Sequence, residues 1–88
     1  MPDYSKLPGS LQNGMKRYIE EGVIPGHFLR AVLENNLSES FARADDMNRL
    51  HMYDIVSWMY NEAPIDCWGS EKKIKAWIEM RRAEKSET

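Results

Sequence analysis

Apolar side chains recur at helical spacing along most of this 88-residue chain. In the first segment Leu7, Leu11 and Met15 are four residues apart, which places them on one side of a helix. Glycine, proline and short polar residues separate the helical segments, and no stretch alternates with period two for long enough to form a convincing strand. The periodicity therefore predicts an all-α fold.

The expected architecture is a compact single-domain bundle of four helices plus one short helix over residues 1–88, with an ordered core of about 7–82 and frayed termini. Gly22, Asn35 and Pro64 mark expected helix ends, because glycine and asparagine tolerate a left-handed backbone and proline clashes with a preceding helical turn. Residues that commonly cap helix N-termini precede the later segments: Ser38, Asp45 and Ser70.

The segment 46–62 is the longest expected helix. At 100° per residue, six of its side chains cover one arc of about 160°: Met52, Tyr53, Ile55, Val56, Met59 and Tyr60. This arc is expected to face the core, whereas Trp58 points to another side with less obvious cover. In the short helix that precedes it, residues 38–44, Phe41 is the expected apolar anchor and Leu37 packs beside it.

The composition favours a folded, cytoplasmic domain. Hydrophobic residues make up 42% of the chain and charged residues 30%, with both signs interspersed. The net charge of −2 lacks the basic excess typical of dedicated nucleic-acid-binding proteins. The single cysteine, Cys67, excludes an internal disulfide and a Cys-rich zinc module. No apolar run approaches the ~18–20 residues of a membrane span, and the polar start is unlike a signal peptide.

No group of residues predicts catalysis, and the expected protein is non-enzymatic, with no metal and no cofactor. A nucleophilic site would combine Cys67 with His27 or His51 as base, but no motif joins them. Cys67 is expected to be a small apolar plug in a packed loop. His51 and Asp54 are three residues apart on one helix and supply two ligands, whereas a metal site needs three or four.

Residues 25–44 also fit the spacing of a helix-turn-helix, which binds DNA through its second helix. Here that helix is only about two turns long and leads into Asp45 and Asp46, whose carboxylates would face the phosphates. Nucleic acid is therefore not the expected partner. The alternative function that stays open is a small nucleic-acid-binding regulator that uses the basic C-terminal helix, with Lys72, Lys73, Lys75, Arg81 and Arg82.

One surface is the expected partner-binding site. It joins acidic helix openings to a methionine, a histidine and a tryptophan: Asp45, Asp46, Met47, His51, Asp54 and Trp58. Aromatic residues and methionine are enriched at the centres of protein interfaces. Trp58 has two open interpretations, as an exposed contact residue or as a core residue covered by the N-terminal segment or the Trp68 loop. A homodimer is also open, since a two-fold contact uses one patch twice.

Several stretches together resemble a family of small uncharacterised proteins encoded by tailed bacteriophages and prophages. The similar stretches are Tyr18-Ile19-Glu20-Glu21-Gly22, residues 22–37 with their Pro-Gly-x-Phe-Leu-x-Ala-Val pattern, 44–48, 60–64 and Cys67-Trp68-Gly69-Ser70. The resemblance covers about residues 8–78 and supplies no catalytic residues. It implies a bacterial cytoplasm as the setting. The expected function is a phage or prophage accessory protein that binds a host or phage protein, for example to inhibit a host factor or defence system.

Overall fold

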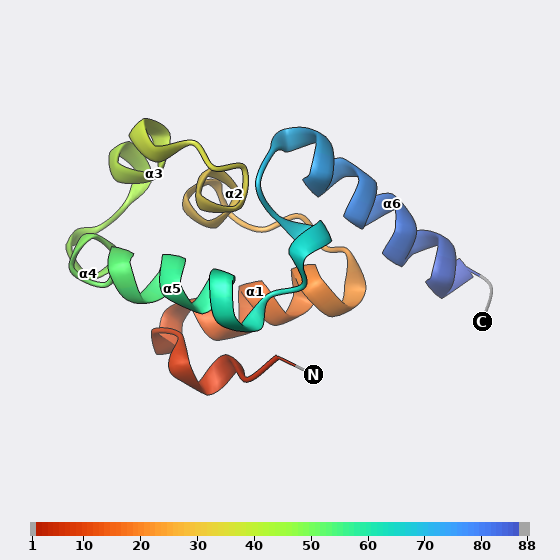
Figure 1. Cartoon of the computed structure of the whole chain (residues 1–88), viewed down its shortest axis with the longest axis horizontal. Coiled ribbons are helices and arrows are strands. Elements are labelled where there is room, and N and C mark those ends of the chain that lie inside the picture. The colour runs from red at the N-terminus through yellow and green to blue at the C-terminus, as the bar shows by residue number, and fades with distance from the viewer. Residues whose placement is uncertain (1, 87–88) are drawn as a thin grey trace.

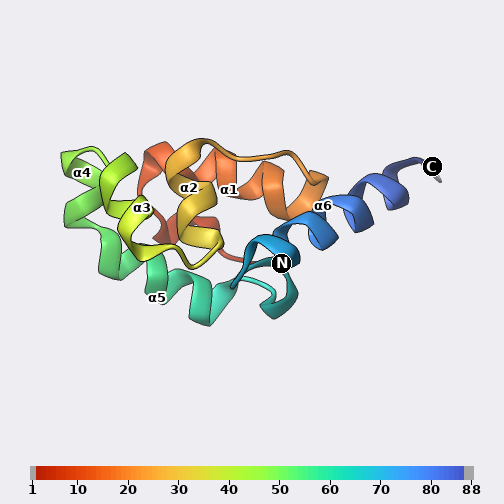
Figure 2. The ribbon, with the colours of Figure 1, turned by 90° about the horizontal axis from the view of Figure 1, so that it is seen from above.

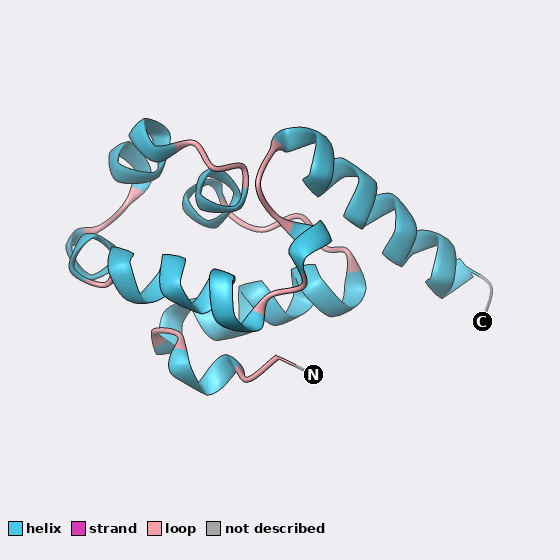
Figure 3. Cartoon of the chain, viewed as in Figure 1, coloured by secondary structure: helices cyan, strands magenta, loops and turns pink. Residues whose placement is uncertain are grey.

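The computed structural model describes residues 2–86, and within this range every regular element is a helix (Figures 1 and 3). The predicted all-α fold is confirmed. The elements in chain order are η1 (Tyr4–Lys6), α1 (Gly9–Glu21), α2 (His27–Leu33), α3 (Leu37–Arg43), α4 (Asp46–Leu50), α5 (Met52–Glu62), η2 (Ile65–Cys67) and α6 (Glu71–Ser86).

The first two helices bury the residues that their periodicity predicts. Leu11, Met15, Tyr18 and Ile19 of α1 are buried, and so are Phe28, Leu29, Val32 and Leu33 of α2. Both helices also end where predicted. Gly22 has a φ of 71° and closes α1 in the left-handed conformation, and Asn35 has a φ of 63° just after α2. Local sequence signals therefore suffice for the buried sides and the C-terminal ends of α1 and α2.

The N-terminal cap of α3 differs from the prediction. Asn36, and not Ser38, caps this helix, because its side-chain Oδ1 accepts the backbone N–H of Glu39 at 3.2 Å. Asparagine and serine both suit this position. Because the cap lies two residues earlier than predicted, α3 begins at Leu37.

The residues that α3 turns inward also differ from the prediction. Phe41 is 42% exposed and Leu37 is 68% exposed, so neither anchors the helix. Ser40 and Ala44 are buried instead. Ser40 satisfies its hydroxyl by donating to the carbonyl of Asn36 at 2.6 Å. These small side chains allow α3 to lie close to α2, which leaves the larger side chains at the rim.

The predicted helix 46–62 is wrong as one continuous element. His51 has φ −100° and ψ 13°, which separates α4 from α5. Asp45 caps α4 as predicted, with its side chain accepting the N–H of Asn48 at 2.8 Å. The segment contains no glycine or proline, so its sequence carries no signal for the interruption.

The buried side of α5 is rotated from the predicted arc. Met52, Ile55 and Met59 are buried as expected, but Trp58 joins them at 3% exposure. Tyr53 and Tyr60, expected in the core, are 82% and 74% exposed. A tyrosine hydroxyl is readily hydrated, whereas the larger indole of Trp58 gains more from burial once another segment covers it. The core therefore takes the tryptophan side of this helix.

That covering segment is the N-terminus, which the prediction placed outside the ordered core. Residues 4–6 form η1, and Asp3 caps it by accepting the N–H of Ser5 at 3.0 Å. The backbone N–H of Asp3 also donates to Oε1 of Glu62 at 3.0 Å. The start is therefore held to the C-terminal end of α5.

The last helix runs from the core outward and extends beyond the other helices (Figures 1 and 2). Ser70 caps it as predicted, accepting the N–H of Lys73 at 3.2 Å. Trp77 Nε1 and Arg81 Nε donate to the carbonyl of Ile19 at 3.0 and 2.9 Å, which fixes α6 to the end of α1. The helix continues to Ser86, beyond residue 83, from which the tail was expected to fray.

Candidate functional site

The structure exposes the acidic start of the predicted partner-binding surface. Asp45, Asp46 and Met47 are exposed, with Met47 at 55%. Asp45 caps α4 with one carboxylate oxygen, so part of its negative charge is offset by the N-terminus of that helix. Asp46 lies 3.9 Å from Arg49 one turn later. This surface is accessible, but local partners offset its charge.

His51 and Asp54 form a pair of their own. His51 Nδ1 and Asp54 Oδ2 are 3.1 Å apart, and both side chains are partly exposed. Two groups at this spacing do not make a metal site. Within residues 2–86 no three histidine, cysteine or acidic side chains gather where they would hold an ion.

Trp58 does not belong to an exposed patch, and its assignment as a contact residue is wrong. The side chain is 3% exposed, and its Nε1 donates to the backbone carbonyl of Asp3 at 2.7 Å. The ring of Tyr4 lies against it, with ring centroids 5.6 Å apart. The interpretation in which the N-terminal segment covers Trp58 is confirmed. The predicted surface thereby loses its aromatic centre.

Exposed apolar side chains gather instead beside α5, on the side that the helical wheel assigned to the core. We call this surface the aromatic face, and its members come from α5, the start of α3, η2 and the turn before α6: Leu37, Tyr53, Val56, Tyr60, Ile65 and Trp68. Val56 and Trp68 are half-buried, and the other four are at least two-thirds exposed. Such clustering of large apolar groups is the usual mark of a binding surface.

The centre of the aromatic face is a fixed pair of rings. Tyr60 and Trp68 meet edge to face, with ring centroids 4.9 Å apart, although 74% of Tyr60 stays exposed. The loop that carries Trp68 is held on both sides. The N–H of Gly69 donates to the carbonyl of Leu33 at 2.7 Å, and Cys67 is fully buried. The pair is therefore preorganised, so that a partner would not have to order it.

Two hollows flank this ring pair, and both are lined by Met59, Tyr60 and Trp68. The smaller measures about 80 Å³ and includes Leu37 in its wall. The larger measures about 290 Å³ and includes Ile65 and Lys73. Among the described residues that line them, Lys73 is the only charged one. An interface centre is characteristically aromatic and poor in charge, as this surface is.

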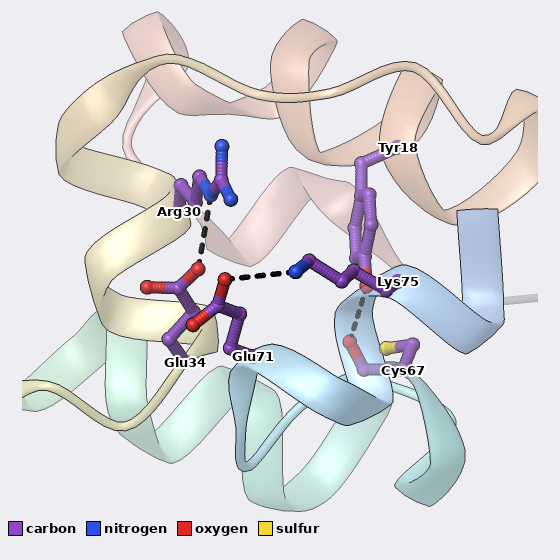
Figure 4. Close-up of polar contacts among 6 residues, drawn as sticks. All are labelled: Tyr18, Arg30, Glu34, Cys67, Glu71 and Lys75. Carbon is purple, nitrogen blue, oxygen red and sulfur yellow. Dashed lines mark hydrogen bonds and ion pairs between the residues drawn. The ribbon is translucent and has the colours of Figure 1, made fainter.

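A charged hollow of about 220 Å³ lies elsewhere, between α2, α3 and α6. Arg30 and Glu34 pair at 2.9 Å on α2, and Lys75 and Glu71 pair at 3.1 Å on α6 (Figure 4). Glu39, the third carboxylate in its wall, pairs with Arg43 at 2.7 Å. Each carboxylate therefore has a cation of its own helix beside it, which offsets the charge available to a ligand.

Cys67 has the environment of a core residue and not of a nucleophile. Its side chain is fully buried, and burial raises the pKa of its thiol from 9.0 to about 12. Its carbonyl accepts the hydroxyl of Tyr18 at 2.6 Å (Figure 4). A thiol with a raised pKa is protonated at neutral pH and reacts slowly. The predicted plug in a packed loop is confirmed.

The basic side chains of α6 are partly committed to contacts within the chain. Lys75 pairs with Glu71, and Arg81 pairs with Glu84 at 2.8 Å while its guanidinium lies 4.8 Å from the ring centroid of Trp77. These contacts compete with phosphate binding.

Among the described residues, no helix has the length and apolar character needed to cross a membrane.

No protein-family model, curated protein or solved structure matches the chain. Its candidate site therefore rests on its own residues.

Sequence reasoning missed the aromatic face for an identifiable reason. A helical wheel groups Tyr53 and Tyr60 with Ile55 and Met59, but it does not show which flank of the apolar arc another segment will cover. The available signal was the hydroxyl on both tyrosines, which permits exposure, while the indole of Trp58 favours cover.

Proposed function

We propose that this chain is a non-enzymatic interaction protein that binds another protein through the aromatic face. One observation carries the proposal: the exposed ring of Tyr60 is held edge to face against the half-buried Trp68, on an almost uncharged surface where the two rings line two hollows. Tyrosine and tryptophan dominate the binding energy of protein interfaces when they lie at the centre of the contact.

The proposed setting comes from the resemblance to proteins of tailed bacteriophages and prophages. In a bacterial cytoplasm, a protein of this kind acts by occupying a site on a host or phage protein, such as a host factor or a component of a defence system. The buried, unreactive thiol of Cys67 supports a binding role over nucleophilic catalysis. The aromatic face replaces the surface around Met47 as the preferred contact, because Trp58 is buried.

Site-specific photo-crosslinking in bacterial cells tests this assignment. A photoreactive amino acid replaces Tyr60 on the aromatic face, Met47 on the acidic surface, or the exposed Lys16 on α1 as a control. We expect one discrete protein adduct from position 60 and none from position 16. An adduct from position 47 alone would instead establish the acidic surface as the contact.

Salt dependence separates the alternative, a nucleic-acid-binding regulator that uses α6. Binding through phosphates falls steeply as salt rises, by about a thousand-fold or more for several contacts between low and moderate salt. Binding through an apolar face changes little. Retention of nucleic acid at low salt, lost at moderate salt and lost in Lys72→Ala, would favour the regulator.

A further inference from the structure

We propose that the larger hollow of the aromatic face binds the C-terminus of the partner protein, with the partner's last side chain between the apolar walls and its carboxylate on Lys73. The inference rests on the proposed function, because it names the part of the partner that the same face contacts. Three observations support it: the walls of the hollow are apolar, two hydrogen-bond donors that line it lack acceptors, and no carboxylate of the described residues lines it.

The walls of this hollow suit one large apolar side chain. The volume is about 290 Å³, close to the ~300 Å³ at which ligand pockets begin. Buried Met59 and half-buried Ala63 and Trp68 line it, and Tyr60 and Ile65 line it with rings and methyl groups that are mostly exposed. An apolar group that enters the hollow leaves water and covers exposed apolar surface, which favours binding.

Lys73 adds a positive charge to this hollow. It lines the hollow together with Gly69, and its side chain lies along this glycine, with Nζ 3.6 Å from where a Cβ of residue 69 would be. Lys75, half a turn later on α6, pairs with Glu71 at 3.1 Å, but no carboxylate in the described part of the chain pairs with Lys73. The charge of Lys73 is therefore available to an anionic group of a ligand.

Trp68 supplies a second donor. The indole N–H groups of Trp58 and Trp77 each donate to a backbone carbonyl, whereas that of Trp68 has no acceptor within residues 2–86. Indole N–H groups usually have a partner when they are buried, and binding would bury this half-exposed ring further. Lys73 and Trp68 thus line one hollow with two donors, a combination that suits the oxygen atoms of a carboxylate.

The last residue of a protein matches this combination, because it carries a carboxylate and a side chain on the same Cα. In an extended peptide, successive side chains point to opposite sides, and the next one on the same side is about 7 Å away. An internal acidic residue therefore separates its carboxylate from a neighbouring apolar side chain. Capture of a C-terminal carboxylate is also an established mode of peptide recognition.

A peptide array tests this assignment. It carries peptides of random sequence, each once with a free C-terminal carboxylate and once as a C-terminal amide, and it is probed with the full-length labelled protein. We expect binding to free C-termini whose last residue is large and apolar, and binding weaker by about ten-fold or more for the same peptides as amides. No bound peptide, or equal binding of acids and amides, would overturn the proposal.

Three variants assign the carboxylate contact to one side chain. Lys73→Met keeps the apolar stem but removes the charge, and it should weaken binding of the free C-termini by about ten-fold or more. Lys73→Arg should retain binding, since a guanidinium also binds carboxylates. Lys72→Met is the matched control, because Lys72 is exposed on the same turn and does not line the hollow. Circular dichroism checks that all three remain folded, and wild-type binding by Lys73→Met would overturn the proposal.

The photo-crosslinker at position 60 separates this inference from the proposed function. A discrete adduct from position 60, together with equal binding of acids and amides on the array, refutes the C-terminal contact and leaves the proposed function standing. No adduct from position 60 and no bound peptide overturn both.

Discussion

The indole N–H of Trp58 donates a hydrogen bond of 2.7 Å to the backbone carbonyl of Asp3, 55 positions earlier in the chain. This bond joins α5 to the N-terminal segment and satisfies the polar atom of a ring that is 3% exposed. Tyr4 adds its ring to the same contact. Tyr4 and the backbone of Asp3 therefore cover the core beside α5, and they determine which side of α5 is left for a partner.

Replacing Trp58 should destabilise the protein in two separable steps. Trp58→Phe keeps most of the buried ring but leaves the Asp3 carbonyl without its donor, at a cost of about 1 kcal/mol. Trp58→Ala also creates a cavity and should lower the free energy of unfolding by about 3–5 kcal/mol. Urea unfolding measures both. Tyr53→Ala, at an 82% exposed position on the same helix, should stay within about 0.5 kcal/mol of wild type.

Trp58→Ala as stable as wild type would contradict the burial of the indole and revive its role as a contact residue. Removal of residues 2–6 provides a second comparison, because it uncovers the same ring without altering α5. It should therefore lower stability as well.

The contrast between α1 and α5 shows how much of this fold the sequence predicts. The stripe of α1 contains Leu11, Met15 and Ile19, whose burial has no competing alternative, and all are buried. On α5, tyrosines flank one edge of the apolar arc and Trp58 flanks the other, so periodicity alone leaves the buried edge undecided. A contact with Asp3, distant in sequence, makes the choice. The candidate site could not be predicted for the same reason, because it lies on the edge of the apolar arc of α5 that the core leaves exposed.

The N-terminal caps of the helices show a second limit on what the sequence predicts. Asp45 and Ser70 cap where predicted, although Asp46 directly follows the first of them. Before α3, Asn36 and Ser38 are both good caps, and their intrinsic preferences are nearly equal. The choice of Asn36 follows from Asn35, whose left-handed backbone ends α2 and directs the chain into the next helix.

This corrected cap gives a sharp prediction for a pair of substitutions. Asn36→Ala should lower the free energy of unfolding by about 1 kcal/mol, because the N–H of Glu39 loses its acceptor. Ser38→Ala should have an effect of less than about 0.5 kcal/mol, since Ser38 is an exposed residue inside the first turn. Thermal unfolding monitored by circular dichroism compares the two variants. A larger loss for Ser38→Ala would show that α3 begins where the sequence alone placed it.

Glycine at position 22 should be required, whereas glycine at position 9 should not. Gly22 has a φ of 71°, and an added Cβ would lie 2.9 Å from Cβ of Arg81 and 3.1 Å from the carbonyl oxygen of Ile78. Gly22→Ala should therefore cost more than the ~1–2 kcal/mol of a left-handed alanine alone, because α1 and α6 must also separate. Gly9→Ala is the control, since nothing lies within 4 Å of its added Cβ.

Equal stability of the two alanine variants would contradict the close approach of α1 to α6. A second readout comes from Trp77, which donates to Ile19 at the same junction. Its fluorescence should change in Gly22→Ala and stay unchanged in Gly9→Ala, because only the first substitution moves the helix ends apart.

Stability should fall as the pH rises above 9, and Cys67 should carry the first part of that loss. Burial raises the pKa of its thiol from 9.0 to about 12, so between these values the unfolded chain releases a proton that the folded chain keeps. The folded state then binds more protons than the unfolded state, and the free energy of unfolding decreases with pH. The expected loss is about 1.4 kcal/mol between pH 8 and pH 10.

Cys67→Ala isolates this contribution, because it removes the thiol and leaves the tyrosines in place. Burial also raises the pKa of Tyr18, whose ordinary value is 10.0, so its loss of the same sign begins about one pH unit higher. Urea unfolding at pH 8, 9 and 10 should give a steep decline for the wild type and a shallow one for Cys67→Ala. Parallel declines would mean that the thiol is accessible when the protein is folded, and an alkylating reagent at pH 8 would then modify it without unfolding.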